Sequence, residues 1–417
     1  MTTVAGTGRR QAALVSLVEA IRQLEGLTEQ VGPFALPPAA CDRAPELVAA
    51  VCGALDVPLR FDAPPGGRRP DHALAALVAR IRQAQGDPEF AALDPSDVAT
   101  LASQARRLRD EEDARYRRHI LHRPDGTTVR VFDVGRPDAT CIVFSPACAM
   151  DARLCLPWSW ALSGSYRCLI PQTRGTTGRI EDPEAFDRRG YGVDHQAGDL
   201  IALLDQFMTS RVHLMAFCGG AVPALALAAL RPDRVASLSV WHGDLELGVD
   251  AAKTEHQTNL RALLDMAGES RETAAWMRDR LASGPMSGVP DGIGPLVVRP
   301  YATAELLYRY AKLTGATMHW DCRATAARVS QPCLVVTSRD DHTAHPAGSR
   351  RLAEILIDST LVMTEHGTHL DAFRATDEQV RCLTSFLAVR HPGEHLPASH
   401  DNRPAEGWRG QVPARSN

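Results

Sequence analysis

The chain of 417 residues is long enough to bury a sizeable core, as one large domain with additions or as two domains. Hydrophobic residues make up 44% and charged residues 23% of the sequence, which is typical of a soluble globular protein. The net charge is -4 and no basic stripe occurs, so nothing indicates nucleic acid or an anionic membrane as a partner.

The amino terminus has an arginine pair but no apolar segment followed by a small-residue cleavage site, and no stretch reaches transmembrane length. The ten cysteines are scattered, mostly in apolar segments such as TCIVF and QPCLVV, and none form a CxxC pair. We therefore expect a cytoplasmic protein whose cysteines are buried thiols, without a disulfide framework or a zinc site.

Helical spacing of apolar residues dominates residues 1–116. It occurs in four segments, at residues 11–27, 45–55, 72–85 and 95–118. Proline- and glycine-rich breakers separate them, and no alternating β-branched run is present. The pattern predicts a small, all-helical N-terminal region.

The pattern changes to strands from residue 117 onward. RRHILHRPDGTTVRVFDVG predicts a hairpin with its turn at Pro124-Asp125-Gly126. Six short apolar runs follow, mostly separated by helical stretches: CIVFS, YRCLIP, VHLMAF, VASLSVW, CLVVTS and STLVMTE. This alternation predicts an α/β fold in which residues 117–244 and 326–390 form a mainly parallel sheet with helices on both faces.

A long stretch without a strand interrupts this alternation. It contains helical segments and the bend GPMSGVPDGIGP, and it greatly exceeds an ordinary crossover, so we interpret residues 245–325 as an inserted lid. Residues 391–417 are polar and rich in proline and glycine, and they are predicted to be a disordered tail.

Cys218 stands where the apolar strand of HLMAFCGGA meets an alanine-rich helix. Ala216 and Gly220 are small, as the neighbours two positions from the apex of a tight strand-to-helix turn must be. An apex thiol would face the helix dipole, which favours the thiolate, and the N–H of Gly219 would point at an incoming carbonyl oxygen. Taken alone, the motif also allows Cys218 to be a small buried hydrophobe that only fills the core.

A nucleophile at such a turn needs an acid and then a histidine later in the chain. The loop after CLVVTS supplies Asp340 and Asp341, and the loop after STLVMTE supplies His366 and His369. Both loops should reach the same sheet edge as Cys218, because the carboxyl ends of parallel strands gather there.

We predict that Asp341 is the acid, because an apparent loop and Pro346 separate it from the next helix, whereas Asp340 should face solvent. We predict that His369 is the base, since Gly367 lets the loop swing back over the sheet. His366 is the second choice of base, and Asp244 is the fallback acid.

A metal site is an alternative interpretation of the same loops. DHTAH (residues 341–345) and HGTH (366–369) place several nitrogen and oxygen ligands close together in sequence. We expect no metal, because none of these histidines lies on a clear helix at i, i+4 spacing and the strand-to-helix turn would be unexplained.

The second oxyanion donor is expected in the loop PACAMDARLC that follows CIVFS. Pro146 has no N–H. We predict Met150 as the donor. Cys148 is a further candidate for facing the site, although one thiol among ten is more simply structural.

Together these features resemble the α/β-hydrolase superfamily over about residues 117–390, with cysteine in place of serine. Within it, CAMDARLCLPW, QTRGTTG, FCGGA and WHGDLELG followed by KTEHQTNL are similar to the cysteine-dependent aminoacyltransferases of nonribosomal peptide biosynthesis, of the coronamic acid and syringomycin pathway type. The resemblance implies that Cys218 carries an aminoacyl group between the phosphopantetheine thiols of two carrier proteins, with His369 as base and Asp341 orienting it. It implies no cofactor on the enzyme itself, because the phosphopantetheine belongs to the carrier.

Two other functions stay open at this point. A cysteine nucleophile exchanges one thioester for another at almost no free-energy cost, which favours transfer between thiols. It does not exclude hydrolysis by a type II thioesterase or a lactone hydrolase, and a scaffold that binds a partner through its N-terminal helices is also possible. The candidate substrate-binding residues are Trp241, Asp244, His256 and Cys148, and we expect Asp244 or Glu246 to accept a substrate ammonium.

Overall fold

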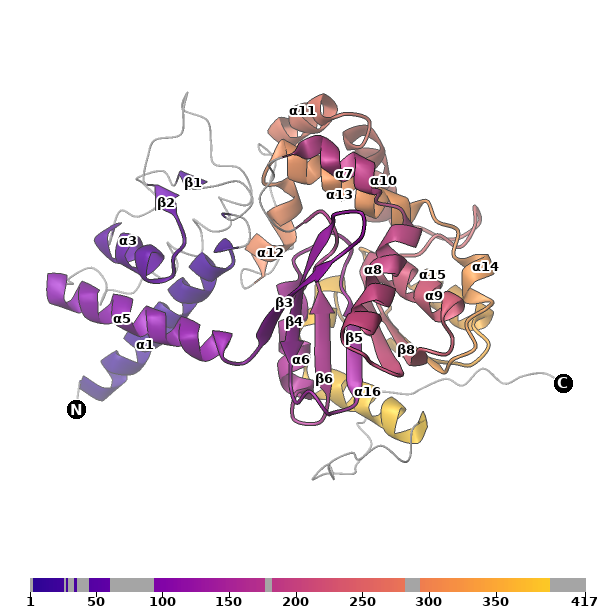
Figure 1. Ribbon diagram of the computed structural model, residues 1–417, viewed down its shortest axis with the longest axis horizontal. Coiled ribbons are helices and arrows are strands. Elements are labelled where there is room, and N and C mark those ends of the chain that lie inside the picture. The colour runs from indigo at the N-terminus through magenta and orange to yellow at the C-terminus, as the bar shows by residue number, and fades with distance from the viewer. Residues whose placement is uncertain are drawn as a thin grey trace. The chain divides into compact units, whose positions relative to one another are not determined.

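The computed structural model describes residues 3–25, 28, 34–35, 45–60, 94–176, 182–281 and 293–390. The chain forms two compact units (Figure 1). Unit 1 comprises Met1–Arg115, Thr177–Pro183 and Arg271–Leu307, and unit 2 comprises Tyr116–Thr176, Glu184–Ser270 and Tyr308–Asn417. The predicted lid is therefore divided between the two units. The predicted helix at residues 72–85 and the predicted tail lie outside the described residues.

Unit 1 is mainly helical. Its helices are α1 (Thr3–Arg22), α3 (Pro45–Ala54), α5 (Pro95–Asp113), α11 (Arg271–Leu281), α12 (Gly294–Val298) and the 3-10 turn η6 (Arg299–Tyr301). Two short strands, β1 (Phe34–Ala35) and β2 (Leu59–Arg60), pair in parallel, so the prediction of an all-helical region is wrong in this detail. They escape sequence analysis because a two-residue strand is too short to show alternation.

Unit 1 has its own hydrophobic core, which joins segments far apart in the sequence. The N-terminal helices contribute Leu17, Val48 and Leu101, and the later segment contributes Val298 and Leu306, all at most 4% exposed. Residues 271–307 of the predicted lid thus belong with the N-terminal helices, because both present apolar side chains that need burial.

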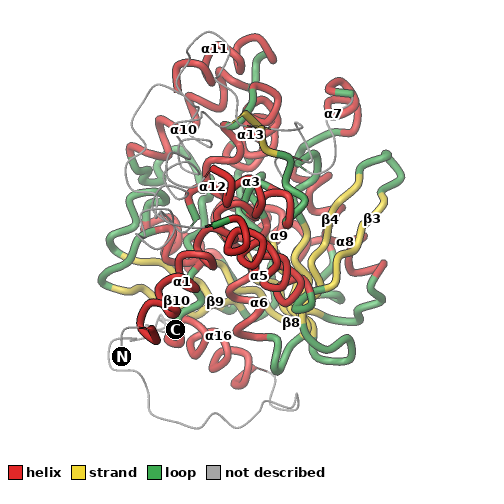
Figure 2. The backbone as a smooth tube through the Cα atoms, turned by 90° about the vertical axis from the view of Figure 1, so that its left-hand side faces the viewer, coloured by secondary structure: helices red, strands yellow, loops and turns green. Residues whose placement is uncertain are grey.

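Unit 2 contains an eight-stranded sheet in the order β10-β9-β8-β7-β5-β6-β4-β3. Its strands are β3 (Arg117–His122), β4 (Thr128–Val134), β5 (Cys141–Ser145), β6 (Arg167–Pro171), β7 (Val212–Phe217), β8 (Val235–Trp241), β9 (Cys333–Ser338) and β10 (Ser359–Thr364). All neighbours are parallel except that β4 runs antiparallel to both β3 and β6. The predicted hairpin, strands and mainly parallel sheet are confirmed, and Figure 2 shows the β3–β4 hairpin from the side.

Helices cover both faces of this sheet. One face carries α8 (Val193–Gln206), α9 (Ala221–Leu230), α14 (Arg323–Ala326) and α15 (Pro346–Ile355), and in this order each helix contacts the next. The other face carries α6 (Leu156–Leu162), which contacts α16 (Asp377–Arg390) (Figure 1). The remaining helical segments are α7 (Pro183–Arg189), α10 (Glu255–Ala267), α13 (Ala304–Met318), η4 (Ala152–Cys155), η5 (Cys218–Gly220) and η7 (His369–Phe373). Every residue of β7 and β8 is buried, as expected for central strands covered on both faces.

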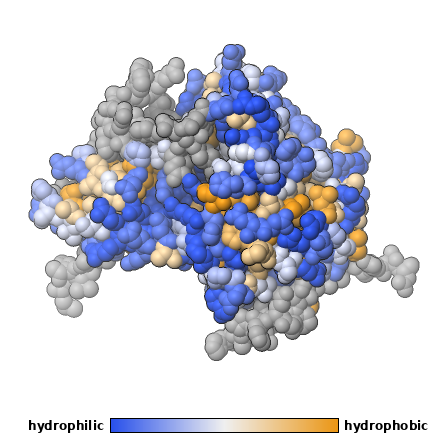
Figure 3. Space-filling view, in the orientation of Figure 1, coloured by the Kyte–Doolittle hydropathy of each residue, from blue (hydrophilic) through white to orange (hydrophobic). Residues whose placement is uncertain are grey.

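No helix among the described residues is long and apolar enough to cross a membrane. The described surface on the face drawn in Figure 3 is largely hydrophilic, with scattered apolar positions. The nine cysteines that the structure describes are free thiols.

Candidate active site

Cys218 lies at the apex of the turn between β7 and α9. Its φ of 49° lies in the left-handed region, which is strained for a residue with a Cβ. A Cβ on Gly220 would lie 2.2 Å from the carbonyl oxygen of Pro146 and 2.4 Å from that of Ser145, so only glycine is accommodated. Cys218 is partly exposed rather than buried, which argues against its being core filling.

His369 connects Cys218 to a buried acid. The side chain of His369 interacts electrostatically with Cys218, and its Nδ1–H donates to Asp341 Oδ2 at 3.0 Å. Because Nδ1 is used by Asp341, Nε2 is the nitrogen left for the thiol. Burial alone would lower the pKa of His369, but the charge on Cys218 and the hydrogen bond to Asp341 hold it well above its usual value.

Both carboxylate oxygens of Asp341 accept two hydrogen bonds each. Its Oδ1 accepts the backbone N–H groups of Thr343 at 2.8 Å and Ala344 at 3.0 Å, and its Oδ2 accepts two imidazoles. Burial by itself would raise the pKa of this carboxyl, but the hydrogen bonds from His242 and His369 hold it well below its usual value. The structure thus brings Cys218, His369 and Asp341 together in the predicted order.

His242 is a fourth member of this group that the sequence analysis missed. It follows β8, is 6% exposed, and its Nδ1 lies 2.7 Å from Asp341 Oδ2. Its ring meets that of His369 edge to face, with centroids 5.7 Å apart. Burial lowers the pKa of His242 more strongly than the Asp341 hydrogen bond raises it.

A signal for His242 was present in the chain. It directly follows β8, which lies in the sheet between β7 and β9, the strands that lead into Cys218 and Asp341. A residue directly after β8 must therefore lie between the nucleophile and the acid. That position follows from strand order, which the sequence did not specify.

The second choice of base, His366, and the fallback acid, Asp244, are not part of this hydrogen-bonded group. His366 pairs with Asp340 at 2.8 Å, and the side chains of both are exposed, as predicted for Asp340. Asp244, the fallback acid, accepts Gln257 Nε2 at 2.6 Å and bonds no histidine among the described residues.

Of the residues weighed as metal ligands in the sequence, Asp341 and His369 lie together, and His242 joins them. Ligand atoms of His242, Asp341 and His369 lie within 4.8 Å of one another. A carboxylate only accepts hydrogen bonds, so each Nδ1 must carry a proton directed at the shared oxygen. That arrangement is a hydrogen-bonded cluster. His345 instead caps α15 by accepting the N–H of Ala347 at 3.1 Å.

The predicted oxyanion donor at Met150 is wrong, because its N–H donates to the carbonyl oxygen of Ala147 at 3.1 Å. The N–H of Ala149 is also engaged, by Thr173 Oγ1 at 3.0 Å. The N–H of Cys148 has no partner among the described residues. The Cys148 Cβ lies 3.4 Å from the point where a Cβ on Gly219 would be. Cys148 therefore replaces Met150 as the candidate donor beside Gly219.

The thiol of Cys148 is not a second nucleophile. It is buried and donates to Gln196 Oε1 at 3.3 Å, and burial raises its pKa to about 12, so the thiol stays protonated at neutral pH.

The other two predicted substrate-binding residues, His256 and Trp241, differ in their exposure to solvent. His256 is exposed at the start of α10, and partial burial, then the charge on His369, lower its pKa. Trp241 is fully buried and packs on Trp158 with ring centroids 4.8 Å apart. It offers no surface to a substrate, so that prediction is wrong.

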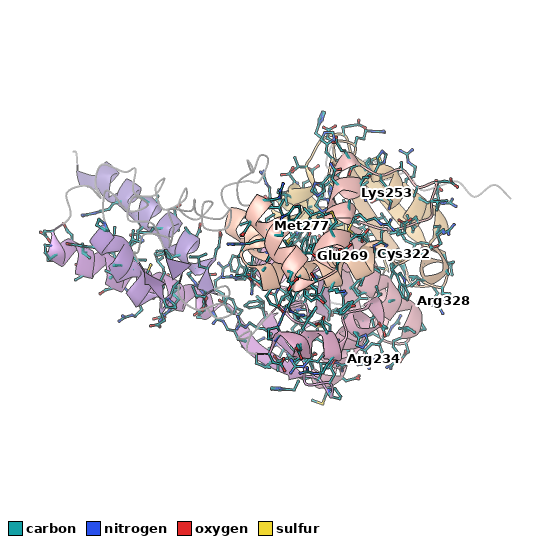
Figure 4. All side chains as sticks on the ribbon, turned by 90° about the horizontal axis from the view of Figure 1, so that it is seen from above. Arg234, Lys253, Glu269, Met277, Cys322 and Arg328 are labelled. Carbon is teal, nitrogen blue, oxygen red and sulfur yellow. The ribbon has the colours of Figure 1, made fainter. Side chains whose placement is uncertain are left out.

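A cavity of about 280 Å³ opens beside the loop that follows β8. Its lining includes Asp244, Glu246, Lys253, Gln257, Arg261 and Met318. Glu246 pairs with Arg261 at 3.0 Å and with Lys253 at 3.5 Å. Its carbonyl oxygen accepts the backbone N–H of Cys322 at 2.8 Å, and Figure 4 labels both Lys253 and Cys322. Asp244 is 9% exposed and has no ion-pair partner among the described residues.

The cavity lies near the candidate catalytic group. Asp244 is two residues from His242. Met318 directly follows Thr317, whose Oγ1 lies 3.3 Å from the point where a Cβ on Gly219 would be. Two residues of the cavity lining are therefore close in sequence to residues at the candidate catalytic group.

No protein-family model matches the chain. The chain is similar to RutD, a curated protein provisionally named a carbamate hydrolase, from two bacteria. RutD of Variovorax paradoxus (strain S110) is 29% identical over 270 residues, 62% of this chain and 96% of its own. RutD of Pseudomonas savastanoi pv. phaseolicola is 26% identical over 253 residues, 60% of this chain and 94% of its own.

Two solved structures share the fold. A thermophilic esterase from Thermogutta terrifontis has a TM-score of 0.52 and 16% identity, and covers 66% of this chain and 99% of its own. A membrane phospholipase A has a TM-score of 0.54 and 16% identity, and covers 76% of this chain and 98% of its own. The chain thus has the α/β-hydrolase fold and is distantly homologous to RutD-type proteins.

Proposed function

We propose that the protein is a cysteine-dependent acyl-transfer enzyme that forms a thioester on Cys218. The observation that carries the proposal is the series Cys218, His369 and Asp341, in which His369 interacts with Cys218 and is hydrogen-bonded to Asp341, with Cys218 partly exposed at a strained turn. A positioned imidazole with a raised pKa stabilises a neighbouring thiolate, which is the reactive form of cysteine.

In the first half-reaction the thiolate of Cys218 attacks the carbonyl carbon of a thioester or ester substrate. The negative charge that develops on the carbonyl oxygen would be held by the N–H groups of Gly219 and Cys148. The bond to the leaving group breaks, the leaving thiol or alcohol takes the proton from His369, and the acyl group remains on Cys218.

In the second half-reaction an acceptor loses its proton to His369 and attacks the acyl-Cys218 carbonyl carbon, and the thiolate leaves. We propose a thiol acceptor, in particular the phosphopantetheine thiol of a carrier protein. Thioester exchange is nearly neutral in free energy, and the short motifs around Cys148 and Cys218 resemble aminoacyltransferases of this kind.

An unpaired buried carboxylate supports an amine-bearing acyl group. Asp244 lines the cavity beside the site, accepts Gln257 Nε2 and has no ion-pair partner among the described residues, while Glu246 is paired with Arg261 and Lys253. A buried charge is costly without a partner, so a substrate ammonium would find a matching site here.

Hydrolysis is the second candidate function, with water as the acceptor. It is favoured by the carbamate hydrolase name of the RutD relatives. Both candidates share the acyl-Cys218 step and differ only in the second half-reaction.

Mass spectrometry of the intact protein after mixing with an aminoacyl carrier protein tests the proposal. We expect an acyl adduct that is absent from Cys218→Ala and that moves to a second carrier on its addition. His369→Ala should slow adduct formation by about 10³-fold or more, as loss of a triad base does. The matched control His366→Ala should react like the wild type, because its side chain is exposed and bound to Asp340.

Free amino acid released without the second carrier would instead establish hydrolysis. The absence of any adduct on the folded wild-type protein, with several aminoacyl and acyl carriers, would refute acyl transfer through Cys218.

A further inference from the structure

The carboxylate of Asp341 is held by an unusual set of donors. In a Ser-His-Asp type of triad, one histidine N–H meets the acid. Here Oδ2 accepts two imidazole N–H groups, and the bond from His242, at 2.7 Å, is shorter than the 3.0 Å bond from His369. The position of Oδ2 therefore depends at least as much on His242 as on His369.

His242 is itself held firmly by the sheet. Its backbone N–H donates to the carbonyl oxygen of Val336 in β9 at 2.8 Å. Its φ of 49° is strained for a residue with a Cβ, and such strain persists where the surroundings hold the residue in place. The ring is buried against the edge of His369. The donor atom is thus anchored to two central strands.

We propose that His242 is a positioning residue whose Nδ1–H fixes Asp341 and thereby keeps His369 directed at Cys218. The backbone N–H groups of Thr343 and Ala344 hold Oδ1, and the His242 N–H holds Oδ2 at the sheet edge. The Nδ1–H of His369 then stays on Asp341, and its Nε2 stays on the thiol. The inference relies on the proposed role of Cys218 as the nucleophile.

The surroundings of His242 favour its neutral imidazole form. Asp341, His369 and Asp371 are the charged groups that act on it. Burial and the positive charge of His369 lower its pKa, while the two carboxylates raise it less. A neutral imidazole with its proton on Nδ1 can donate to Asp341 over the whole physiological pH range.

The test compares two substitutions of almost equal size. His242→Gln can still donate an N–H toward Asp341, and His242→Met cannot. The readout is the rate at which iodoacetamide alkylates Cys218 in the full-length protein, followed from pH 5 to 10 by mass spectrometry of the Cys218 peptide. The assay needs no substrate, and melting temperatures show that each variant is folded.

We expect His242→Met to alkylate about 10- to 100-fold more slowly than the wild type near neutral pH, with its profile moved to higher pH, as loss of a charge-assisted hydrogen bond predicts. His242→Gln should stay within about threefold of the wild type, because it keeps the donor. Identical profiles in all three proteins would overturn the proposal. So would equal losses in two folded variants, because the N–H would then not be the cause.

A second measurement covers the case in which His242→Met does not fold. Proton NMR of the wild type should show two low-field imidazole N–H resonances, one from each histidine on Asp341, and His242→Gln should show one. A single such resonance in the wild type would overturn the proposal. If His242→Met is alkylated more slowly than the wild type but the wild type forms no acyl adduct, the proposed function fails while the positioning role stands.

Discussion

The unpaired carboxylate of Asp244 predicts a preference for acyl groups that carry a protonated amine. A unit charge pair at about 4 Å in a partly screened site is worth about 4 kcal/mol before desolvation. Hydrogen bonds to charged groups contribute about 1.5 to 3 kcal/mol after it. Asp244→Asn keeps an oxygen that can accept Gln257 Nε2 and removes only the charge. We therefore expect kcat/KM for an amine-bearing substrate to fall about 10- to 100-fold.

The assay uses two small thioesters that differ only in the amine, alanyl- and propionyl-N-acetylcysteamine. The rate of thiol release is measured for the wild type and Asp244→Asn, and we expect the substitution to slow only the alanyl substrate. Asp265→Asn is the matched control, because Asp265 lines the same cavity but is paired with His319 at 2.6 Å. An alanyl preference that survives in Asp244→Asn, or an equal loss on both thioesters, would refute the reasoning.

Two further predictions concern the stability of the fold. Gly220→Ala should destabilise the fold by about 2 kcal/mol or more and abolish acylation, because its Cβ would lie 2.2 Å from the carbonyl oxygen of Pro146. The Cβ of Gly219→Ala would meet no atom closer than 3.3 Å, so the melting temperature of that variant should equal that of the wild type. Equal melting temperatures for the two variants would contradict this. Asp133 is hydrogen-bonded by Arg167 and Arg117, and although burial opposes them, they lower its pKa to about 2. Its ionised form should therefore contribute about 1 to 2 kcal/mol above pH 4, after allowance for solvent screening, and this should disappear as pH falls from about 4 to 2. Urea unfolding of the wild type and Asp133→Asn across this range checks it, and a stability difference that stays constant with pH would count against it.

Much of the site could be predicted because its signals are local or lie in chain order. The small residues around Cys218 are required by the turn itself, where the missing Cβ of Gly220 lets the first turn of α9 approach the end of β5. Apolar runs with turn residues between them identified the strands. The order nucleophile, acid, histidine then selected Asp341 and His369, because parallel strands bring their carboxyl ends to one edge.

Other assignments depended on contacts that no local pattern carries. How the loop after β5 folds decides that the N–H of Met150 is hydrogen-bonded while that of Cys148 has no partner in the described part of the chain. The burial of Trp241 against Trp158 depends on packing between helix and sheet. Residues 271–307 join the N-terminal helices because both segments have apolar faces to bury, a match between surfaces distant in the chain.

The sequence by itself determined which residues can react and in which order the chain presents them. Only the tertiary structure decided that Asp341 is shared by His369 and His242, because this depends on β8 lying between β7 and β9 in the sheet. Strand order is set by the packing of the whole sheet, so a residue's place beside a distant carboxylate cannot be read from its own neighbours in the chain.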